Sequence, residues 1–123
     1  MRILTLLSAL LLAAPAAAAA GPTLYPARDG NAAAPVLVVY SSLDEPLARP
    51  MILGFQEANP DVAVRYEEML TGEVYDRIVA ETDAGARTAD FAFSSAMDLQ
   101  GKLSNDGYAQ RSDLPMSASW PQW

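Results

Sequence analysis

The chain has 123 residues, carries 15 acidic against 8 basic side chains, and contains neither Cys nor His. Without Cys there is no disulfide, thiol nucleophile or thiolate metal site, and without His the usual general base and the commonest zinc or copper ligand are missing. The formal net charge of −7 argues against a nucleic-acid partner, because such binders need basic patches that displace counterions.

The first 20 residues have the pattern of a secretory signal peptide. Met1-Arg2 gives a positive start, an apolar run covers Ile3–Leu12, and small residues continue to Ala20, where cleavage is expected. A transmembrane anchor is the alternative, but an Ala-rich segment that ends in Gly21-Pro22 makes a poor one. We therefore expect residues 1–20 to be removed and the product to be periplasmic.

The remaining chain divides into a leader and a regular core. Residues 21–35 are rich in Gly, Pro, Ala and Asn, which predicts a flexible leader. The next segments alternate between strand and helix patterns. Strands are expected at Val36–Tyr40, Val62–Glu67 and Ala89–Ser94, and helices at Asp44–Ala58, Thr71–Ala84 and Ala96–Asp106. This order predicts an α/β fold with a parallel β-α-β-α-β-α core, because parallel strands need crossover connections.

Burial is predicted from the same periodicities. The continuous apolar run Val36–Tyr40 suits a central parallel strand, and the alternation of polar residues in Val62–Glu67 places that strand nearer an edge. In the first helix, the apolar stripe is expected to contain Leu47, Met51 and Phe55, with Ala48 and Ile52 alongside. The aromatic side chains at core periods are expected to pack inside: Phe55, Tyr75, Phe91 and Phe93.

Charged residues spaced four apart mark the second predicted helix. Glu73, Arg77 and Glu81 lie at i, i+4 and i+8, so they are expected to pair along the outer face of the helix.

Hydroxyl residues follow each predicted strand. Ser41-Ser42 ends the first strand, Thr71-Gly72 lies after the second, and Ser94-Ser95 ends the third. Ligands in open α/β sheets bind beyond the carboxyl ends of the strands, and free backbone N–H groups at helix starts favour anions. The alternative is that these residues are ordinary helix N-caps, and the pattern alone leaves both interpretations open.

Catalysis has little support in the sequence. No His is present to activate a serine. Asp44, Glu73 and Asp98 are predicted near the same sheet edge as possible paired carboxylates, although first-turn carboxylates that complement helix dipoles explain them more simply. We therefore expect a protein that is not an enzyme.

At this point several segments resemble family 1 extracellular solute-binding proteins, specifically the iron(III)-type binders of bacterial ABC importers. The resemblance extends over residues 36–110. Its segments are Val38–Ser42, Glu57–Pro60, Tyr75–Glu81, Thr88–Ser95 and Asn105–Tyr108.

The resemblance implies a periplasmic binding protein fold of type II, in which two α/β lobes close on a solute. It also implies delivery of that solute to a membrane permease with a cytoplasmic ATPase. Family members are much longer than this chain. We therefore expect an N-terminal fragment, with residues 36–110 forming a partial first lobe and residues 111–123 an irregular, truncated end.

The resemblance also suggests a ligand set. Asp44 and Glu73 stand where ferric members help to hold iron, although the first position is commonly His in those members. No resident cofactor is implied, and iron(III) would be cargo. An organic anion, a phosphonate and a metal–anion complex all remain open as the solute. The expected ligand-binding residues are Ser41, Ser42, Asp44, Thr71, Gly72, Glu73, Ser94 and Ser95.

The sequence leaves two other functions open. One is a small exported α/β enzyme acting on phosphate esters with an Asp or Ser nucleophile. The other is a stand-alone ligand-sensing domain of the same fold, against which the predicted signal peptide argues.

Overall fold

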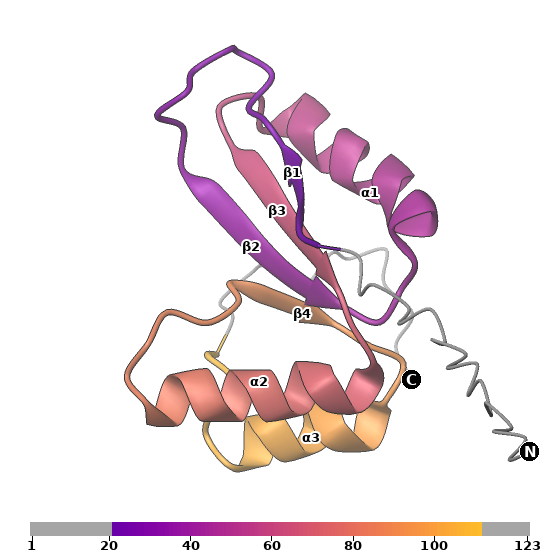
Figure 1. Cartoon of the computed structure of the whole chain (residues 1–123), viewed down its shortest axis with the longest axis vertical. Coiled ribbons are helices and arrows are strands. Elements are labelled where there is room, and N and C mark those ends of the chain that lie inside the picture. Colours follow the sequence, from indigo (N-terminus) through magenta and orange to yellow (C-terminus); the bar gives the residue numbers. More distant parts are fainter. Residues whose placement is uncertain (1–20, 112–123) are drawn as a thin grey trace, which may run out of the picture.

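A computed structural model describes residues 21–111, in which a four-stranded sheet lies between helices (Figure 1). The elements are β1 (Thr23–Tyr25), β2 (Val36–Ser41), α1 (Glu45–Ala58), β3 (Ala63–Glu68), α2 (Thr71–Asp83), β4 (Phe91–Phe93) and α3 (Met97–Asn105). No helix in this part of the chain is long and apolar enough to cross a membrane. The predicted signal peptide (1–20) and residues 112–123 of the predicted irregular end lie outside the described residues.

The sheet confirms the predicted parallel core. Its strand order is β1-β3-β2-β4, and β2 pairs in parallel with both β3 and β4. The continuous apolar run of β2 therefore lies between two neighbours, as its composition predicts. The fold is α/β, with β1 added antiparallel to make a mixed sheet.

Strand β1 corrects the prediction of a flexible leader over residues 21–35. Thr23 pairs with Tyr66, and Tyr25 with Val64, so β1 rather than β3 takes the edge of the sheet. Gln56 is only 2% exposed, and its side-chain amide donates to the carbonyl groups of Tyr25, the last residue of β1, and of Pro26. A three-residue strand is too short for a periodic signal, and only its pairing with β3 defines it.

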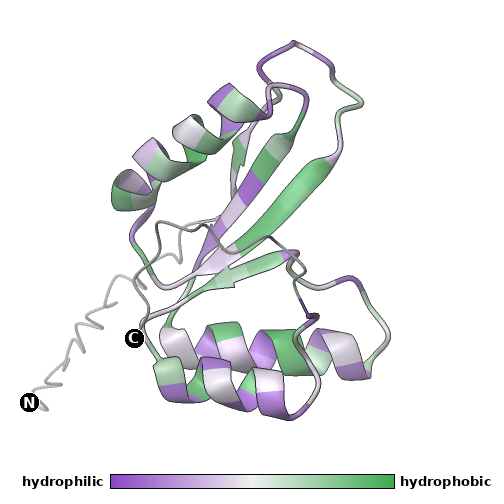
Figure 2. Cartoon of the chain, turned by 180° about the vertical axis from the view of Figure 1, so that it is seen from behind, coloured by the Kyte–Doolittle hydropathy of each residue, from purple (hydrophilic) through white to green (hydrophobic). Residues whose placement is uncertain are grey.

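Two apolar cores form on opposite faces of the sheet. Helix α1 covers one face, and α2 and α3 lie together on the other (Figure 1). Strands β2 and β4 are largely hydrophobic, whereas β3 and the helices carry both hydrophobic and hydrophilic residues (Figure 2). Because successive strand residues alternate between faces, β2 contributes to both cores. The core under α1 contains Val39, Ala48, Ile52, Val64 and Tyr66, and the core under α2 and α3 contains Val38, Tyr40, Val74, Ile78 and Leu103.

The buried face of α1 agrees with the prediction at Ala48 and Ile52 but not at Leu47, Met51 and Phe55. Leu47 and Met51 are 63% and 56% exposed, and Phe55 is also exposed. The neighbouring row, Ala48, Ile52 and Gln56, faces the sheet instead. The reason is that the Gln56 amide binds backbone carbonyl groups beside β1, which fixes the rotation of the helix.

The aromatic residues of β4 are also exposed, contrary to the prediction that they pack inside. Phe91 is 55% exposed and Phe93 is 43% exposed. Their alternation correctly places them on one face of the strand, but none of the described elements covers that face fully. Tyr75, by contrast, packs against the core under α2 and α3 as expected.

Candidate functional site

The segments that follow β2, β3 and β4 meet at one edge of the sheet. The carbonyl of Ser41 accepts a hydrogen bond from the Met69 N–H at 2.9 Å, and the Ser42 N–H donates to the Phe93 carbonyl at 3.2 Å. These bonds join the end of β2 to the segments beyond β3 and β4. The predicted convergence of the three strand ends is therefore present in the structure.

Three of the predicted residues form a hydroxyl cluster at this edge. The Oγ atoms of Ser42 and Ser94 lie 3.5 Å apart, and the Ser95 N–H donates to Ser42 Oγ at 3.4 Å. Ser94 Oγ also accepts the Ala96 N–H at 3.2 Å, just before α3. Gln100 donates to the Ser94 carbonyl at 2.6 Å and holds the turn in place. Ser42 and Ser94 are half-buried and Ser95 is exposed, so the cluster borders solvent.

Ser41 has a different role from its neighbours. Its side chain is fully buried, and its Oγ accepts the Leu43 N–H at 3.0 Å. The Tyr66 hydroxyl donates to the Leu43 carbonyl at 2.5 Å. Burial raises the pKa of Tyr66 above its ordinary value, so this hydroxyl keeps its proton. Ser41 and Tyr66 thus shape the turn after β2 from inside.

The first turn of α2 supplies backbone donors. The Glu73 carboxylate accepts the Leu70 N–H at 2.9 Å, and the first intrahelical bond is from the Val74 N–H to the Leu70 carbonyl at 3.0 Å. The N–H groups of Thr71, Gly72 and Glu73 precede that bond and need acceptors from outside the helix. Together with the positive end of the helix dipole, they favour an anionic oxygen.

Carboxylates make this edge acidic. Asp44 is exposed at the start of α1 and makes no side-chain capping bond, and Glu73 is exposed as well. Glu68, which the sequence analysis did not select, accepts the Glu45 N–H at 2.9 Å. The sequence signal that could have identified Glu68 is its position as the last residue of β3, a strand that ends at this edge. A free anion would be repelled by these charges.

A hollow of about 600 Å³ lies beside the start of α2. Glu68 and Glu73 border it, together with Asp76 and Arg77. In the described part of the chain, no group of three or more acidic residues is arranged to hold a metal ion. The predicted pair of Asp44 and Glu73 is therefore not joined by a third acidic residue in a preformed metal site among the described residues.

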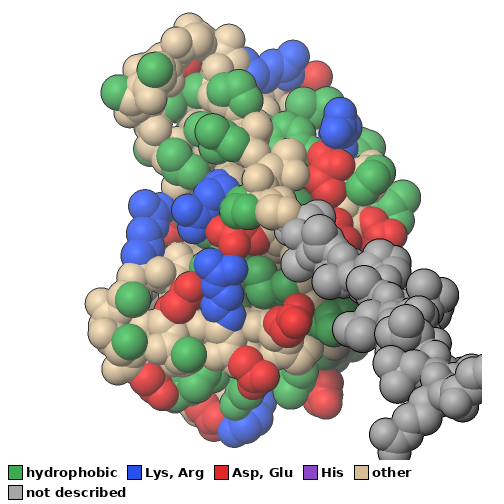
Figure 3. Space-filling model, viewed as in Figure 1, with side chains coloured by type: hydrophobic (Ala, Val, Ile, Leu, Met, Phe, Trp, Pro, Cys, Tyr) green, Lys and Arg blue, Asp and Glu red, His purple; other side chains and the backbone are tan. Residues whose placement is uncertain are grey.

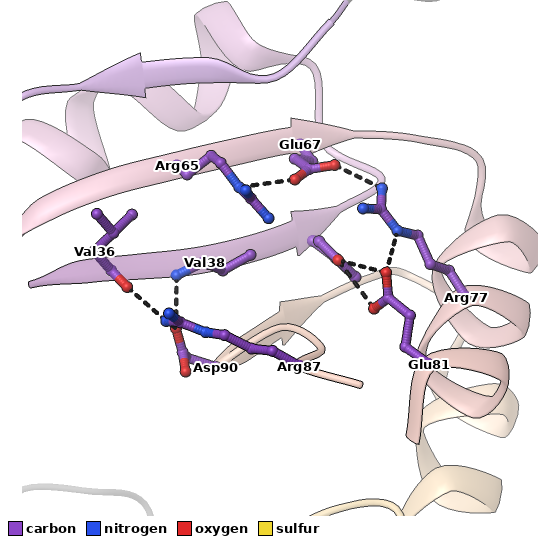
Figure 4. A network of polar contacts seen from close by, with 9 residues as sticks. Val36, Val38, Arg65, Glu67, Arg77, Glu81, Arg87 and Asp90 are labelled. Atoms are coloured by element: carbon purple, nitrogen blue, oxygen red, sulfur yellow. Dashed lines mark hydrogen bonds and ion pairs between the residues drawn. The ribbon is translucent and has the colours of Figure 1, made fainter. Parts of the chain in front are cut away.

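An ion-pair network supports this side of the sheet (Figure 4). The guanidinium of Arg77 donates to Glu67 at 2.6 Å and to Glu81 at 2.8 Å, and Arg65 lies 2.9 Å from Glu67. The predicted pairing of Arg77 with Glu81 is thus present, but Glu73 caps α2 instead of joining it. The pair also faces the sheet and not the outer side of α2 as predicted, because Glu67 and Tyr40 bond to it. On the face seen in Figure 3, Lys and Arg side chains gather across the middle, next to acidic ones.

The network sets the charge states of its members. Hydrogen bonding to Glu81 and Glu67 raises the pKa of Arg77 despite partial burial. Burial acts to raise the pKa of Glu81, but hydrogen bonds from Arg77 and Tyr40 outweigh it and lower that pKa below its ordinary value. Burial and the hydrogen bond to Glu81 raise the pKa of the Tyr40 hydroxyl. Glu81 is therefore ionised and Tyr40 protonated at neutral pH.

Helices on both faces of a largely parallel sheet, with a polar edge where the strands end, form the architecture of α/β proteins in which ligands bind at that edge. Among solved structures, the chain is similar to the substrate-binding protein of an ABC transporter from Agrobacterium tumefaciens. The sequence identity is 75%, and the TM-score is 0.78. The match covers 82% of this chain but only 30% of the Agrobacterium protein. No family model matches the chain, and neither does any curated protein.

This likeness supports the expected fold, since the chain matches part of a substrate-binding protein in both sequence and structure. It also supports the coarser form of the resemblance, a substrate-binding protein of an ABC transporter.

Proposed function

We propose that the chain is the first-lobe part of an exported substrate-binding component of an ABC transporter, which captures a small solute for a membrane permease. The observation that carries the proposal is the 75% identity to such a protein over most of the chain. The polar edge at the ends of β2, β3 and β4 supplies the solute site. A periplasmic location rests on the predicted signal peptide.

The mixed character of the edge favours one class of solute. The hydroxyl groups of Ser42 and Ser95 and the amides of the first turn of α2 suit anionic oxygens. The carboxylates of Asp44 and Glu73 suit a positive centre, and they disfavour a free anion. Among the solutes left open by the sequence, we therefore propose a metal–anion complex, with ferric iron as its metal and as cargo. The anion would supply most of the metal ligands, because no group of three or more acidic residues is arranged to hold a metal ion among the described residues.

This lobe by itself is expected to bind the solute weakly. Ligand sites of this kind bury most of the ligand surface, whereas the edge described here provides one wall. Calorimetric titration of the chain with ferric citrate should give a dissociation constant weaker than micromolar. A sub-micromolar dissociation constant would contradict the proposal that this lobe provides only one wall of the solute site.

The residues of the site are tested by substitution. Thermal-shift titration with ferric citrate should give a smaller shift for Ser42→Ala and for Glu73→Gln than for the unchanged chain. The matched control is Glu57→Gln, because Glu57 lies near the other end of α1 and is highly exposed. Inorganic phosphate serves as the free-anion probe, and a larger shift with phosphate than with ferric citrate would refute the metal–anion proposal.

A phosphate-ester enzyme gains no support from the geometry. The Ser42 hydroxyl lies beside another serine hydroxyl and a backbone N–H, and neither is a base that could activate it. We therefore propose binding and not catalysis.

A further inference from the structure

The predicted cleavage point lies just before β1. Cleavage after Ala20 would make Gly21 the first residue of the processed chain, and β1 begins two residues later at Thr23. Gly21 is exposed. An α-amino group has an ordinary pKa of about 7.7 to 8.0, so it carries a positive charge at neutral pH. Removal of residues 1–20 therefore replaces a neutral peptide bond with a cation close to the sheet.

The register of β1 places this cation beside one carboxylate. Strand β1 runs antiparallel to β3, with Thr23 opposite Tyr66. The same register, continued by two residues, places Gly21 opposite Glu68, the last residue of β3. Directly opposed residues of antiparallel strands have Cα atoms about 4.5 to 5.5 Å apart. The amine of Gly21 is then within reach of the Glu68 carboxylate.

The hollow of about 600 Å³ beside α2 supports this placement independently, because Gly21 and Pro22 line it. Its charged lining comes from two elements. Strand β3 contributes Glu67 and Glu68, and α2 contributes Glu73, Asp76 and Arg77. Four of these five side chains are acidic, so the new amine enters a negative environment.

The carboxylate opposite Gly21 lacks a basic partner. Arg77 is already bonded to Glu67. Glu68, by contrast, accepts the backbone N–H of Glu45, and no Lys or Arg side chain in the described part of the chain pairs with it. The start of α1 adds the carboxylates of Asp44 and Glu45 to this edge. A cation opposite Glu68 is therefore held there by electrostatic attraction.

We infer that removal of residues 1–20 sets the new α-ammonium group of Gly21 against the Glu68 carboxylate, where the two form an ion pair. This inference rests on the proposed function through its export step, since only a processed chain carries this amine. The pair adds one positive charge to the acidic edge and leaves Asp44 and Glu73 for the solute. The solute site of the processed chain is thus less acidic than that of the precursor, which favours a solute with anionic groups.

The test measures the pKa of the new amine. The full 123-residue precursor is expressed, the exported chain is purified, and mass spectrometry determines its first residue, which should be Gly21. The only other amine of the processed chain is Lys102, so reductive methylation with isotope-labelled formaldehyde labels two groups and keeps their charge. In an NMR titration, the α-amine should bind its proton at least about threefold more tightly in the folded chain than in the same chain unfolded in urea.

Substitution identifies the partner of the amine. Glu68→Gln removes the charge but keeps an oxygen that can accept the Glu45 N–H, and it should bring the α-amine pKa towards the value of the unfolded chain. The matched control is Asp61→Asn, because Asp61 is exposed and lies before the other end of β3. It should leave the raised pKa unchanged. Circular dichroism checks that both variants are folded.

Each outcome decides the inference. A first residue other than Gly21, an α-amine pKa that is equal in the folded and unfolded chains, or an unchanged pKa in Glu68→Gln would overturn it. Equal effects of the two substitutions would also overturn it. The titration contains no solute, so a raised pKa in a processed chain that binds no ferric citrate would leave the ion pair standing and refute only the proposed function.

Discussion

Arg77 and Glu67 join α2 to β3 through a hydrogen bond of 2.6 Å, with the Glu67 side chain only 8% exposed and that of Arg77 39% exposed. A nearly buried carboxylate is thus neutralised from a residue that still reaches solvent. The same guanidinium lies 4.4 Å from the centre of the Tyr40 ring, a distance at which a cation is attracted to the ring face. Arg77 therefore connects the helix to two strands of the sheet.

Removing this cation should destabilise the fold. Arg77→Met leaves Glu67 with only the contact from Arg65. We expect a loss of about 2 kcal/mol in the free energy of unfolding, below the full cost of breaking a buried pair because Arg77 is partly exposed. Urea denaturation measures it. Arg49→Met is the control, because Arg49 makes an exposed i,i+4 pair with Glu45 and should lose about 0.5 kcal/mol or less. Equal losses in both variants would contradict the role given to Arg77.

The network also predicts a dependence of stability on pH. The pKa of Glu81 in the folded chain lies below its ordinary value of 4.5. A carboxyl group with a lowered folded-state pKa adds stability above its unfolded pKa and loses it as pH falls through the folded value. Stability should therefore fall as pH drops below about 4.5, and Glu81→Gln should reduce that slope. Urea midpoints from pH 6 to pH 3 provide the measurement, and an unchanged slope in the variant would refute this assignment.

Gln56 should be important for the position of β1. Its amide donates at 3.0 Å to the carbonyls of Pro26 and Val62 and at 3.3 Å to that of Tyr25. Gln56→Leu leaves these acceptors without their donor, and we expect a loss of about 2 kcal/mol. Hydrogen exchange should also become faster at β1. Glu57→Leu changes an exposed neighbour on the same helix and should alter neither the stability nor hydrogen exchange at β1. Matching effects in the two variants would contradict the role of Gln56 in positioning β1.

Two glycines should respond to alanine with opposite signs. Gly85, after α2, has a φ of +65°, which penalises any residue with a Cβ atom. Gly85→Ala should cost about 1 kcal/mol. Gly54 lies inside α1 with open space around an added Cβ, so Gly54→Ala should stabilise by about 0.5 kcal/mol or more. Thermal unfolding measures both, and a shift of the same sign in the two variants would contradict the backbone argument.

The sequence was sufficient for the parallel core because its signals are local and repeated. The apolar run of β2 and the Val74–Ile78 spacing of α2 specify buried faces whatever else surrounds them. Strand β1 was missed because three residues between Pro22 and Pro26 carry no period, and only pairing with β3 defines them. The exposure of Phe91 was missed because alternation identifies a face of a strand but not what covers it.

The site was predictable in part for the same reason. Topology alone brings the residues after parallel strands to one edge, and Ser42, Ser94 and Ser95 do meet there. The sequence could not distinguish the buried, internally bonded Ser41 from the half-buried Ser42 that follows it. That distinction depends on a turn in which the Leu43 N–H reaches back to its hydroxyl.

The central claim is that solute binds where β2, β3 and β4 end. Two-dimensional amide NMR of the isotope-labelled 123-residue chain tests it most directly, because it detects weak binding residue by residue. Titration with ferric citrate should broaden the amide signals of Ser42, Glu73 and Ser95 through the paramagnetic iron, and gallium citrate, the diamagnetic control, should shift the same signals without broadening them. Signals unchanged at these three residues, or changes confined to residues away from this edge of the sheet, would contradict the claim.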